Sequence, residues 1–172
     1  MLIFTDAATS PQHEIAVGAF FYLEPSHLKE YAECNLDDLV VKLADKIIYK
    51  TYPSKKSTWS EIQTVIDALY CVEKKVEPGR KIEIYTDCQS LCDLLGRRKE
   101  KLKKSHFITR TGKVLQNAAL YQALFAIVEK FQIETFKIKG HSSNHLRLTV
   151  QEKIFSVLDK LSRRKLRAIL AK

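Results

Sequence analysis

Four acidic residues lie within or directly after apolar segments of this 172-residue chain. They are Asp6, Glu61, Asp87 and Asp159. A carboxylate among apolar side chains is costly unless hydrogen bonds or a positive charge offset its ionisation. A divalent cation provides that offset, and carboxylates that hold such a cation in a basic protein are suited to act on a phosphodiester. We therefore expect a fold that brings these four acids close together.

The length and composition favour one compact domain spanning residues 1–172, with 45% apolar residues to form its core. No segment approaches the ~20 apolar residues of a membrane span, and the N-terminus lacks the basic-then-apolar pattern of a signal peptide. We therefore expect a cytoplasmic protein with no membrane partner. The four cysteines have no CxxC spacing, which favours free thiols in a reducing compartment over a zinc site.

The net charge of +9 is distributed unevenly along the chain. Residues 1–77 contain eight Lys and Arg against twelve Asp and Glu, whereas residues 78–172 contain 21 against eight. The densest basic stretch is 97–113, with eight basic residues and one Glu. A chain that is basic in one part only is typical of a polyanion-binding surface. The alternative for 97–113 is an ordinary solvated run of charge.

Hydrophobic periodicity predicts an α/β fold with element order β-β-β-α-β-α-α-β-α. The expected strands are 2–6, 15–23, 46–52, 81–86 and 133–138, and the expected helices begin at 57, 88, 114 and 149. The less regular region 24–56 also contains a short helix-like segment at 36–45. Antiparallel strands followed by helix-separated strands predict a five-stranded mixed sheet with helices on both faces.

The expected elements place the four acids near one edge of this sheet. Asp6 and Asp87 each end a short apolar strand, and the carboxyl ends of parallel strands lie side by side. Glu61 lies in the first turn of its helix and Asp159 in the final helix. Several converging carboxylates cannot all stay ionised without a cation, and oxygen ligands select a hard ion such as Mg²⁺ or Mn²⁺.

The motifs around these acids resemble those of type 1-like ribonucleases H, within the wider ribonuclease H-like nuclease superfamily. The similar segments are Phe4-Thr5-Asp6-Ala7, the helix start at Glu61, Tyr85-Thr86-Asp87-Cys88-Gln89-Ser90, Lys139-Gly140-His141 and Asp159-Lys160-Leu161-Ser162-Arg163. The third segment is fairly specific, and the shared element order extends over nearly the whole chain. The resemblance implies a ribonuclease H-like fold and a metal-dependent endonuclease that cuts the RNA strand of RNA–DNA hybrids.

The resemblance also implies the roles of the acids in a two-metal-ion mechanism with Mg²⁺, for which Mn²⁺ is a possible substitute. Asp6 would bridge both ions, Glu61 and Asp87 would complete the ion facing the leaving oxygen, and Asp159 would complete the ion that activates water. The products would carry a 5′-phosphate and a 3′-hydroxyl. His141 corresponds to the family's loop histidine, which assists proton transfer or product release.

Substrate contacts follow from the same resemblance. Gln89 corresponds to a residue that reads the minor groove of the hybrid, while Ser57 and Thr58 stand where the family commonly has amides near the 2′-hydroxyls. A basic protrusion between the corresponding elements contacts the DNA strand in many type 1 enzymes, and its candidate residues here are Arg97, Arg98, Lys101, Lys103 and Lys104.

This chain also departs from the family pattern. Ala7 replaces the usual glycine after the first acid. The spacing from His141 to Asp159 is longer than usual, which leaves Glu152 as an alternative fourth acid. The alternative for Asp159 is a purely structural role in a surface ion pair with Arg163 at i,i+4.

Two other functions fit the sequence pattern. One is a junction-resolving nuclease of the same superfamily acting on structured DNA, which would normally be a dimer. The other is a nucleic-acid-binding module that has the fold without turnover. The presence of all four acids and of Gln89 favours the hybrid-cutting enzyme, for which we expect a monomer.

Overall fold

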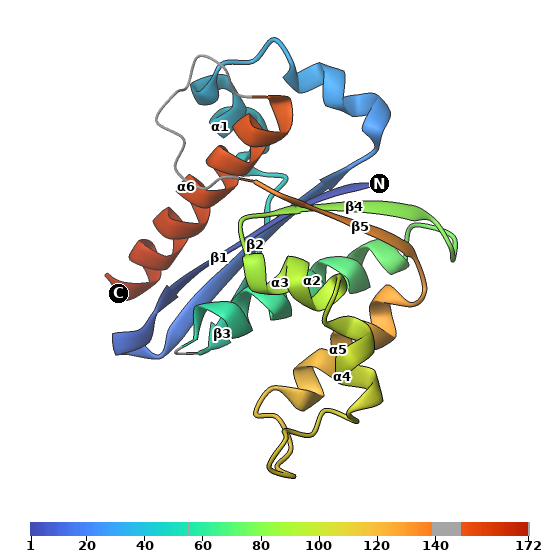
Figure 1. The fold of residues 1–172 in the computed structure, drawn as a ribbon. Coiled ribbons are helices and arrows are strands. Elements are labelled where there is room, and N and C mark those ends of the chain that lie inside the picture. Colours follow the sequence, from blue (N-terminus) through green and yellow to red (C-terminus); the bar gives the residue numbers. More distant parts are fainter. Residues whose placement is uncertain (55, 139–148, 172) are drawn as a thin grey trace.

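The computed structural model describes residues 1–54, 56–138 and 149–171. Its centre is a five-stranded sheet with strand order β3-β2-β1-β4-β5 (Figure 1). The strands are β1 Leu2–Ser10, β2 Ile15–Leu23, β3 Ile48–Pro53, β4 Lys81–Thr86 and β5 Gln132–Lys137. β1, β2 and β3 pair antiparallel, while β4 pairs parallel with both β1 and β5. The predicted mixed sheet is therefore confirmed.

The described part of the chain contains six α-helices. They are α1 Leu36–Ala44, α2 Ser57–Glu73, α3 Gln89–Leu95, α4 Lys99–Lys104, α5 Ala118–Val128 and α6 Val150–Leu170. Of these, α4 lies in a segment that projects away from the sheet (Figure 1). Two short 3-10 helices, η1 Pro11–His13 and η2 Pro25–Tyr31, begin with proline, whose fixed φ suits the first position of a helix.

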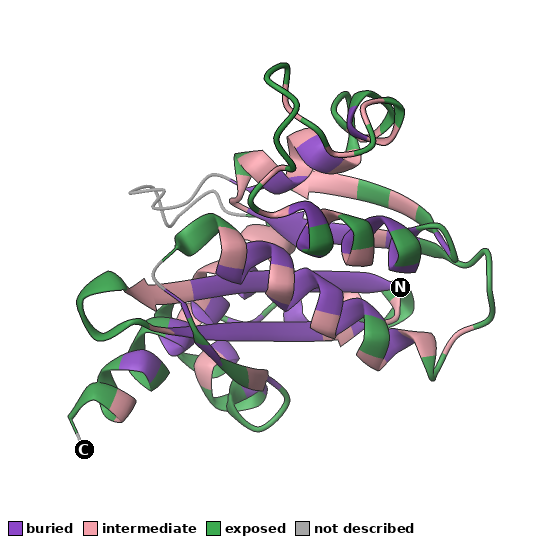
Figure 2. Cartoon of the chain, turned by 90° about the horizontal axis from the view of Figure 1, so that it is seen from below, coloured by how far each residue is buried: buried purple, intermediate pink, exposed green. Residues whose placement is uncertain are grey.

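Alternating side chains of β1 divide the core into two layers. Ile3 packs into the cluster formed by α2, α3 and α5, whereas Leu2 and Phe4 pack into the cluster formed by α1 and α6. This alternation follows from the two-residue side-chain period of a strand. Figure 2 shows that the central strands and the sheet-facing sides of the helices are buried. The expectation of helices on both faces is confirmed.

Beyond shifts of one or two residues at β3, β5, α3 and α6, the structure differs from the sequence-based expectation at three elements. β1 continues four residues past Asp6, because it pairs with β2 as far as the Ser10–Ile15 register. The basic segment contains α4, which was not predicted because its sequence, KEKLKK, has only one apolar residue. α5 begins at Ala118 rather than at Val114, since Val114 instead forms a bridge with Ile108.

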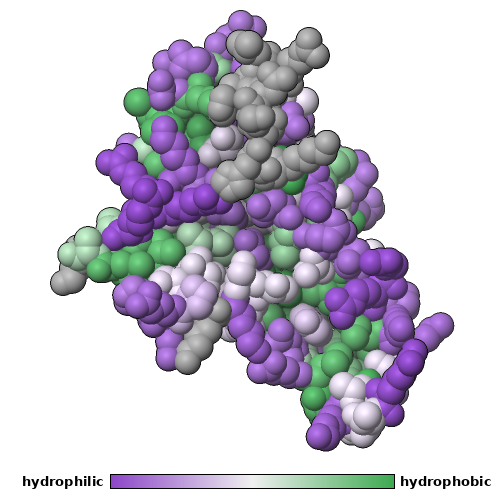
Figure 3. Space-filling model, turned by 60° about the vertical axis from the view of Figure 1, so that its left-hand side comes forward, coloured by the Kyte–Doolittle hydropathy of each residue, from purple (hydrophilic) through white to green (hydrophobic). Residues whose placement is uncertain are grey.

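We name residues 97–117 the basic protrusion. It projects away from the sheet at the lower right of Figure 1. Its tip exposes Ile108 and Val114, and Figure 3 shows apolar residues beside hydrophilic ones at this end of the molecule. The four cysteines are free thiols, as predicted. Within the described residues, none of the helices is long and apolar enough to span a membrane.

Candidate active site

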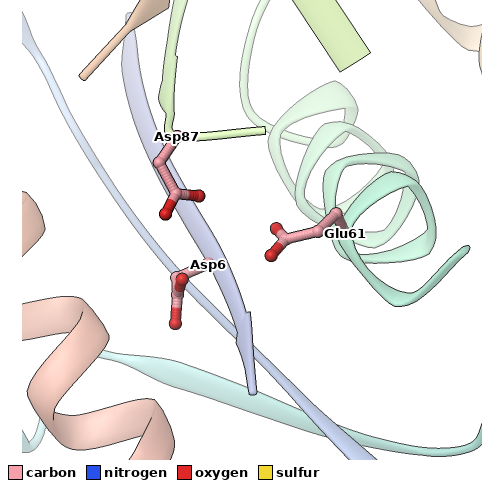
Figure 4. A group of neighbouring side chains, drawn as sticks. All are labelled: Asp6, Glu61 and Asp87. Atoms are coloured by element: carbon pink, nitrogen blue, oxygen red, sulfur yellow. The ribbon is translucent and has the colours of Figure 1, made fainter. Parts of the chain in front are cut away.

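Three of the four predicted acids gather at one end of the sheet. Each of Asp6, Glu61 and Asp87 offers a carboxylate oxygen, and these oxygens all lie within 4.8 Å of one another. Figure 4 shows the three side chains converging from β1, from α2 and from the residue after β4. Three carboxylates at this spacing form a ligand set for a hard divalent cation.

The parallel pairing of β1 with β4 aligns two of these acids. The described register between the strands ends at Phe4 opposite Tyr85, so Asp6 and Asp87 each follow two residues beyond this pair. Just after β4, the backbone N–H of Cys88 donates to Thr86 Oγ1 at 3.1 Å, which fixes the turn that carries Asp87. The two carboxylates therefore meet because the strands share one direction and one register.

Glu61 reaches the same point from α2, which lies across β1 and β2. Gly18 in β2 allows this helix to approach closely. A Cβ atom at Gly18 would lie only 2.1 Å from Thr64 Oγ1 in α2 and 2.7 Å from Tyr52 Cε2. Glycine is therefore required at this position by space rather than by backbone conformation.

Burial makes this acidic group electrostatically unusual. Asp6 is 4% exposed and Glu61 is 7% exposed. Burial, followed by the neighbouring carboxylates, raises the pKa of Asp6 to about 7, against the effect of a hydrogen bond from Ser162 that lowers it. Burial and the charges of Asp6 and Asp87 raise the pKa of Glu61 well above its usual range. Two buried acids with raised pKa values at one point are typical of a functional site.

The hydrogen bonding of the Glu61 carboxylate indicates whether a cation fits between the three acids. Among the described residues, its buried Oε2 atom has no hydrogen-bond partner. A buried carboxylate oxygen without a donor is unfavourable, and it faces two further carboxylates. The donor set consists entirely of oxygen, which suits Mg²⁺ or Mn²⁺ rather than zinc. The residues present therefore fit a divalent metal ion.

Asp159 lies at the same site but outside the group of three. It lines a pocket of about 430 Å³ together with Asp6, Glu61 and Asp87. Its Oδ1 atom also lies 2.6 Å from Arg163 Nε. The i,i+4 ion pair that was the structural alternative to a metal-binding role is therefore present as well. Glu152 instead belongs to the capping box at the start of α6. Its Oε2 atom accepts hydrogen bonds from the backbone N–H and from the hydroxyl of Thr149. This arrangement favours Asp159 as the fourth acid.

The predicted substrate-binding residues lie in two places. Ser57 lines the carboxylate pocket, and Thr58 is exposed beside it at the start of α2. Gln89 is exposed at the start of α3, where its Nε2 atom donates to Asp93 at 3.2 Å.

The predicted protrusion residues are separate from the carboxylate pocket. Arg97, Arg98 and Lys101 line a second pocket of about 780 Å³ in the basic protrusion. Lys104 is exposed at the end of α4, and Lys103 pairs with Glu129. These cations therefore lie apart from the carboxylate pocket. His141 lies outside the described residues, together with the preceding Lys139 and Gly140.

Ser162 adds to the site in a way that sequence reasoning did not assign, and two arginines of α6 accompany it. Ser162 in α6 is fully buried and donates a short hydrogen bond to Asp6 Oδ2. Arg163 and Arg167, one and two helical turns after Asp159, both line the carboxylate pocket. The available sequence signal was the 3.6-residue helical period, which places residues 159, 163 and 167 on adjacent turns of one helix face.

Comparisons with known proteins agree with this architecture. The solution structure of the PFV RNase H domain has a TM-score of 0.65 at 15% identity, over 97% of this chain and 94% of that one. The crystal structure of LC9-RNase H1, a type 1 RNase H with the type 2 active-site motif, gives the same score and identity over 97% and 72%. A foamy viral protease-reverse transcriptase in complex with RNA/DNA hybrid has a TM-score of 0.61 at 11% identity, over 95% of this chain and 19% of that one. These similarities establish a ribonuclease H fold.

The sequence comparison leads to the family. The RNase H family model matches residues 1–153, which include Asp6, Glu61 and Asp87 and end before Asp159. The chain therefore belongs to the RNase H family.

Two curated relatives are similar over part of their length. The ribonuclease H of Zymomonas mobilis is 32% identical over 84 residues, which cover 49% of this chain and 51% of that protein. The ribonuclease H of Orientia tsutsugamushi is 26% identical over 106 residues, which cover 62% and 61%. The chain thus spans between half and three-fifths of the relatives it matches.

Proposed function

We propose that this protein is a metal-dependent endonuclease that hydrolyses the RNA strand of RNA–DNA hybrids. The observation that carries the proposal is the group formed by the buried Asp6 and Glu61 and the half-buried Asp87 on a ribonuclease H fold. Its donor set and the unpartnered Glu61 Oε2 atom fit a divalent cation. Membership of the RNase H family and a curated relative named ribonuclease H support the choice of reaction.

The proposed roles of the acids follow the two-metal-ion arrangement. Asp6 would bridge two Mg²⁺ ions, with Mn²⁺ as a substitute. Glu61 and Asp87 would hold one ion, and Asp159, released from Arg163, would hold the other. The bound ions would supply Lewis-acid activation for in-line hydrolysis that leaves a 5′-phosphate and a 3′-hydroxyl. His141 would assist proton transfer or product release.

The basic residues would position the nucleic acid. Arg163 and Arg167 bring positive charge into the carboxylate pocket, where the backbone of the cut strand would lie. Arg98 and Lys101 in the basic protrusion would contact phosphates of the other strand. Ser57 lines the carboxylate pocket, and we assign to Ser57, Thr58 and Gln89 the contacts with bases and 2′-hydroxyls, which distinguish RNA from DNA.

A panel of end-labelled substrates tests the proposal. Hybrid, single-stranded RNA, duplex DNA and a four-way junction are incubated with the protein in Mg²⁺, Mn²⁺ or EDTA. We expect metal-dependent cutting of RNA in the hybrid alone. Preferential junction cutting would replace the proposal with a structured-DNA nuclease, and hybrid binding without cutting in either metal would replace it with a binding module. A sizing column adds a check, since we expect a monomer.

A further inference from the structure

The Ser162 hydroxyl contacts the most buried acid of the site. Ser162 lies on α6 and is 0% exposed, and its Oγ atom donates to Asp6 Oδ2. The same Oγ atom lies 2.9 Å from the backbone carbonyl of Asp159, three residues earlier on the helix. A hydroxyl has one proton to donate, and an ionised carboxylate is a stronger acceptor than a peptide carbonyl. The proton therefore goes to Asp6 when that carboxylate is ionised.

This contact joins the two elements that carry the first and fourth acids. Asp6 belongs to β1, and Asp159 belongs to α6. Since Ser162 follows Asp159 by less than one helical turn, a hydrogen bond from Ser162 to Asp6 fixes how α6 sits against the strand. It also fixes the plane of the Asp6 carboxylate, because it restrains one of the two oxygens. Groups that orient metal-binding side chains in this way commonly change metal affinity 10–100-fold when they are removed.

We propose that Ser162 is a positioning residue that holds the Asp6 carboxylate, and with it the spacing between Asp6 and Asp159, in the geometry that binds divalent cations. The inference rests on the proposed function, because it assigns Asp6 to a metal site. Ser162 does not itself bind the ion or touch the substrate. Its effect is exerted through Asp6.

A second buried helical serine provides a matched control. Ser60 in α2 is also 0% exposed, and its Oγ atom donates to the backbone carbonyl of Lys56 at 3.1 Å. Both serine hydroxyls contact a backbone carbonyl of the preceding turn of their own helix. The Ser162 hydroxyl also donates to a carboxylate, that of Asp6. Ser60→Ala therefore measures the cost of losing a buried helical hydroxyl, whereas Ser162→Ala measures that cost together with the loss of the contact to Asp6.

The test is titration of Mn²⁺ into the whole metal-free protein, followed by calorimetry, for wild type, Ser162→Ala and Ser60→Ala. Circular dichroism checks that each protein is folded; alanine is well tolerated in helices. We expect Ser162→Ala to weaken Mn²⁺ binding about tenfold and Ser60→Ala to change it less than about twofold. In hybrid cleavage, the metal concentration at half-maximal rate should rise by the same factor for Ser162→Ala. Saturating metal should restore kcat.

Two outcomes overturn the inference in distinguishable ways. Equal Mn²⁺ affinity for wild type and Ser162→Ala would show that the hydroxyl has only a packing role, with the metal site itself intact. Absence of Mn²⁺ binding by the wild-type protein would instead remove the metal site, and the proposed function would fail together with the inference.

Discussion

In the metal-free protein, the buried position of Asp6 disfavours the ionised form of its carboxyl group. It is almost fully buried, beside two other acids, and burial raises its pKa from 3.8 to about 7. The folded chain therefore keeps a proton that the unfolded chain loses, so this group stabilises the fold fully below about pH 4. That contribution is lost as the pH rises through about 7. The raised pKa of Glu61 acts in the same direction.

This linkage predicts how the metal should affect stability. Above about pH 7 Asp6 carries a buried charge that a bound cation would neutralise, whereas at about pH 5 it holds a proton with which the cation must compete. We expect Mg²⁺ to raise the melting temperature clearly at about pH 8 and little at about pH 5, as measured by thermal unfolding. A shift of equal size at both values would contradict the assignment.

The Asp6→Asn variant is the control for this pH dependence. It removes the buried charge, so the metal-free variant should be more stable than wild type at about pH 8, on the order of 2–4 kcal/mol. The advantage should shrink at about pH 5, where the wild-type acid is protonated. The variant should also lose most of the stabilisation by Mg²⁺.

At the scale of elements, α2 approaches the sheet closely only because of Gly18. We expect Gly18→Ala to destabilise the protein by about 1–3 kcal/mol, because the added methyl group would overlap Thr64 and Tyr52. Urea unfolding measures the loss. Gly96→Ala is the comparison, since its Cβ would meet only the Cys92 carbonyl at 3.1 Å. An equal cost at the two positions would show that close packing of α2 is not the cause.

The elements with clear hydrophobic patterns could be predicted from the sequence. The strand at 15–23 has the predicted bounds, and α2 begins at Ser57 as predicted, because the continuous apolar run of the strand and the helical spacing after Ser57 are unambiguous. α4 lacks such a pattern, and its Leu102 becomes buried only through tertiary packing. The end of β1 also depends on a partner strand, so its length was underestimated.

The positions of the acids could be predicted from the strands and helices that carry them, whereas the contact of Ser162 with Asp6 could not. Asp6 and Asp87 could be paired from strand direction, and Asp159 with Arg163 from helical spacing. The contact of Ser162 with Asp6 instead depends on where α6 packs against β1. That packing is long-range, since residues 6 and 162 are far apart in the chain. The sequence therefore indicated which acids meet and that Arg163 can pair with Asp159, but not the hydroxyl that contacts Asp6.

Over the whole molecule, the two parts of the chain differ in net charge: residues 1–77 are acidic and residues 78–172 are basic. The basic residues are concentrated after residue 77, in the basic protrusion and along α6. Binding of a polyanion at such a surface releases counterions, so hybrid binding should weaken steeply as salt rises. The acidic first half should contribute little to this dependence.

This separation predicts the salt dependence of protrusion variants. We expect Lys101→Ala and Lys104→Ala each to weaken hybrid binding and to reduce the slope of log affinity against log salt by about one. Lys29→Ala, an exposed lysine in the acidic half, is the matched control and should leave the slope unchanged. Fluorescence anisotropy over a range of salt measures these slopes. Unchanged slopes for both protrusion variants would remove the protrusion from the binding surface.

The most direct test of the whole account compares binding with cleavage in the Asp87→Asn variant. The change removes one charge from the group of three acids and keeps the side-chain shape, so we expect hybrid binding close to wild type and a loss of cleavage of at least about a hundredfold. Asp45→Asn, at the exposed end of α1, is the charge-matched control and should cut normally. Cleavage by Asp87→Asn at the wild-type rate would contradict the central claim that these carboxylates form the reacting centre.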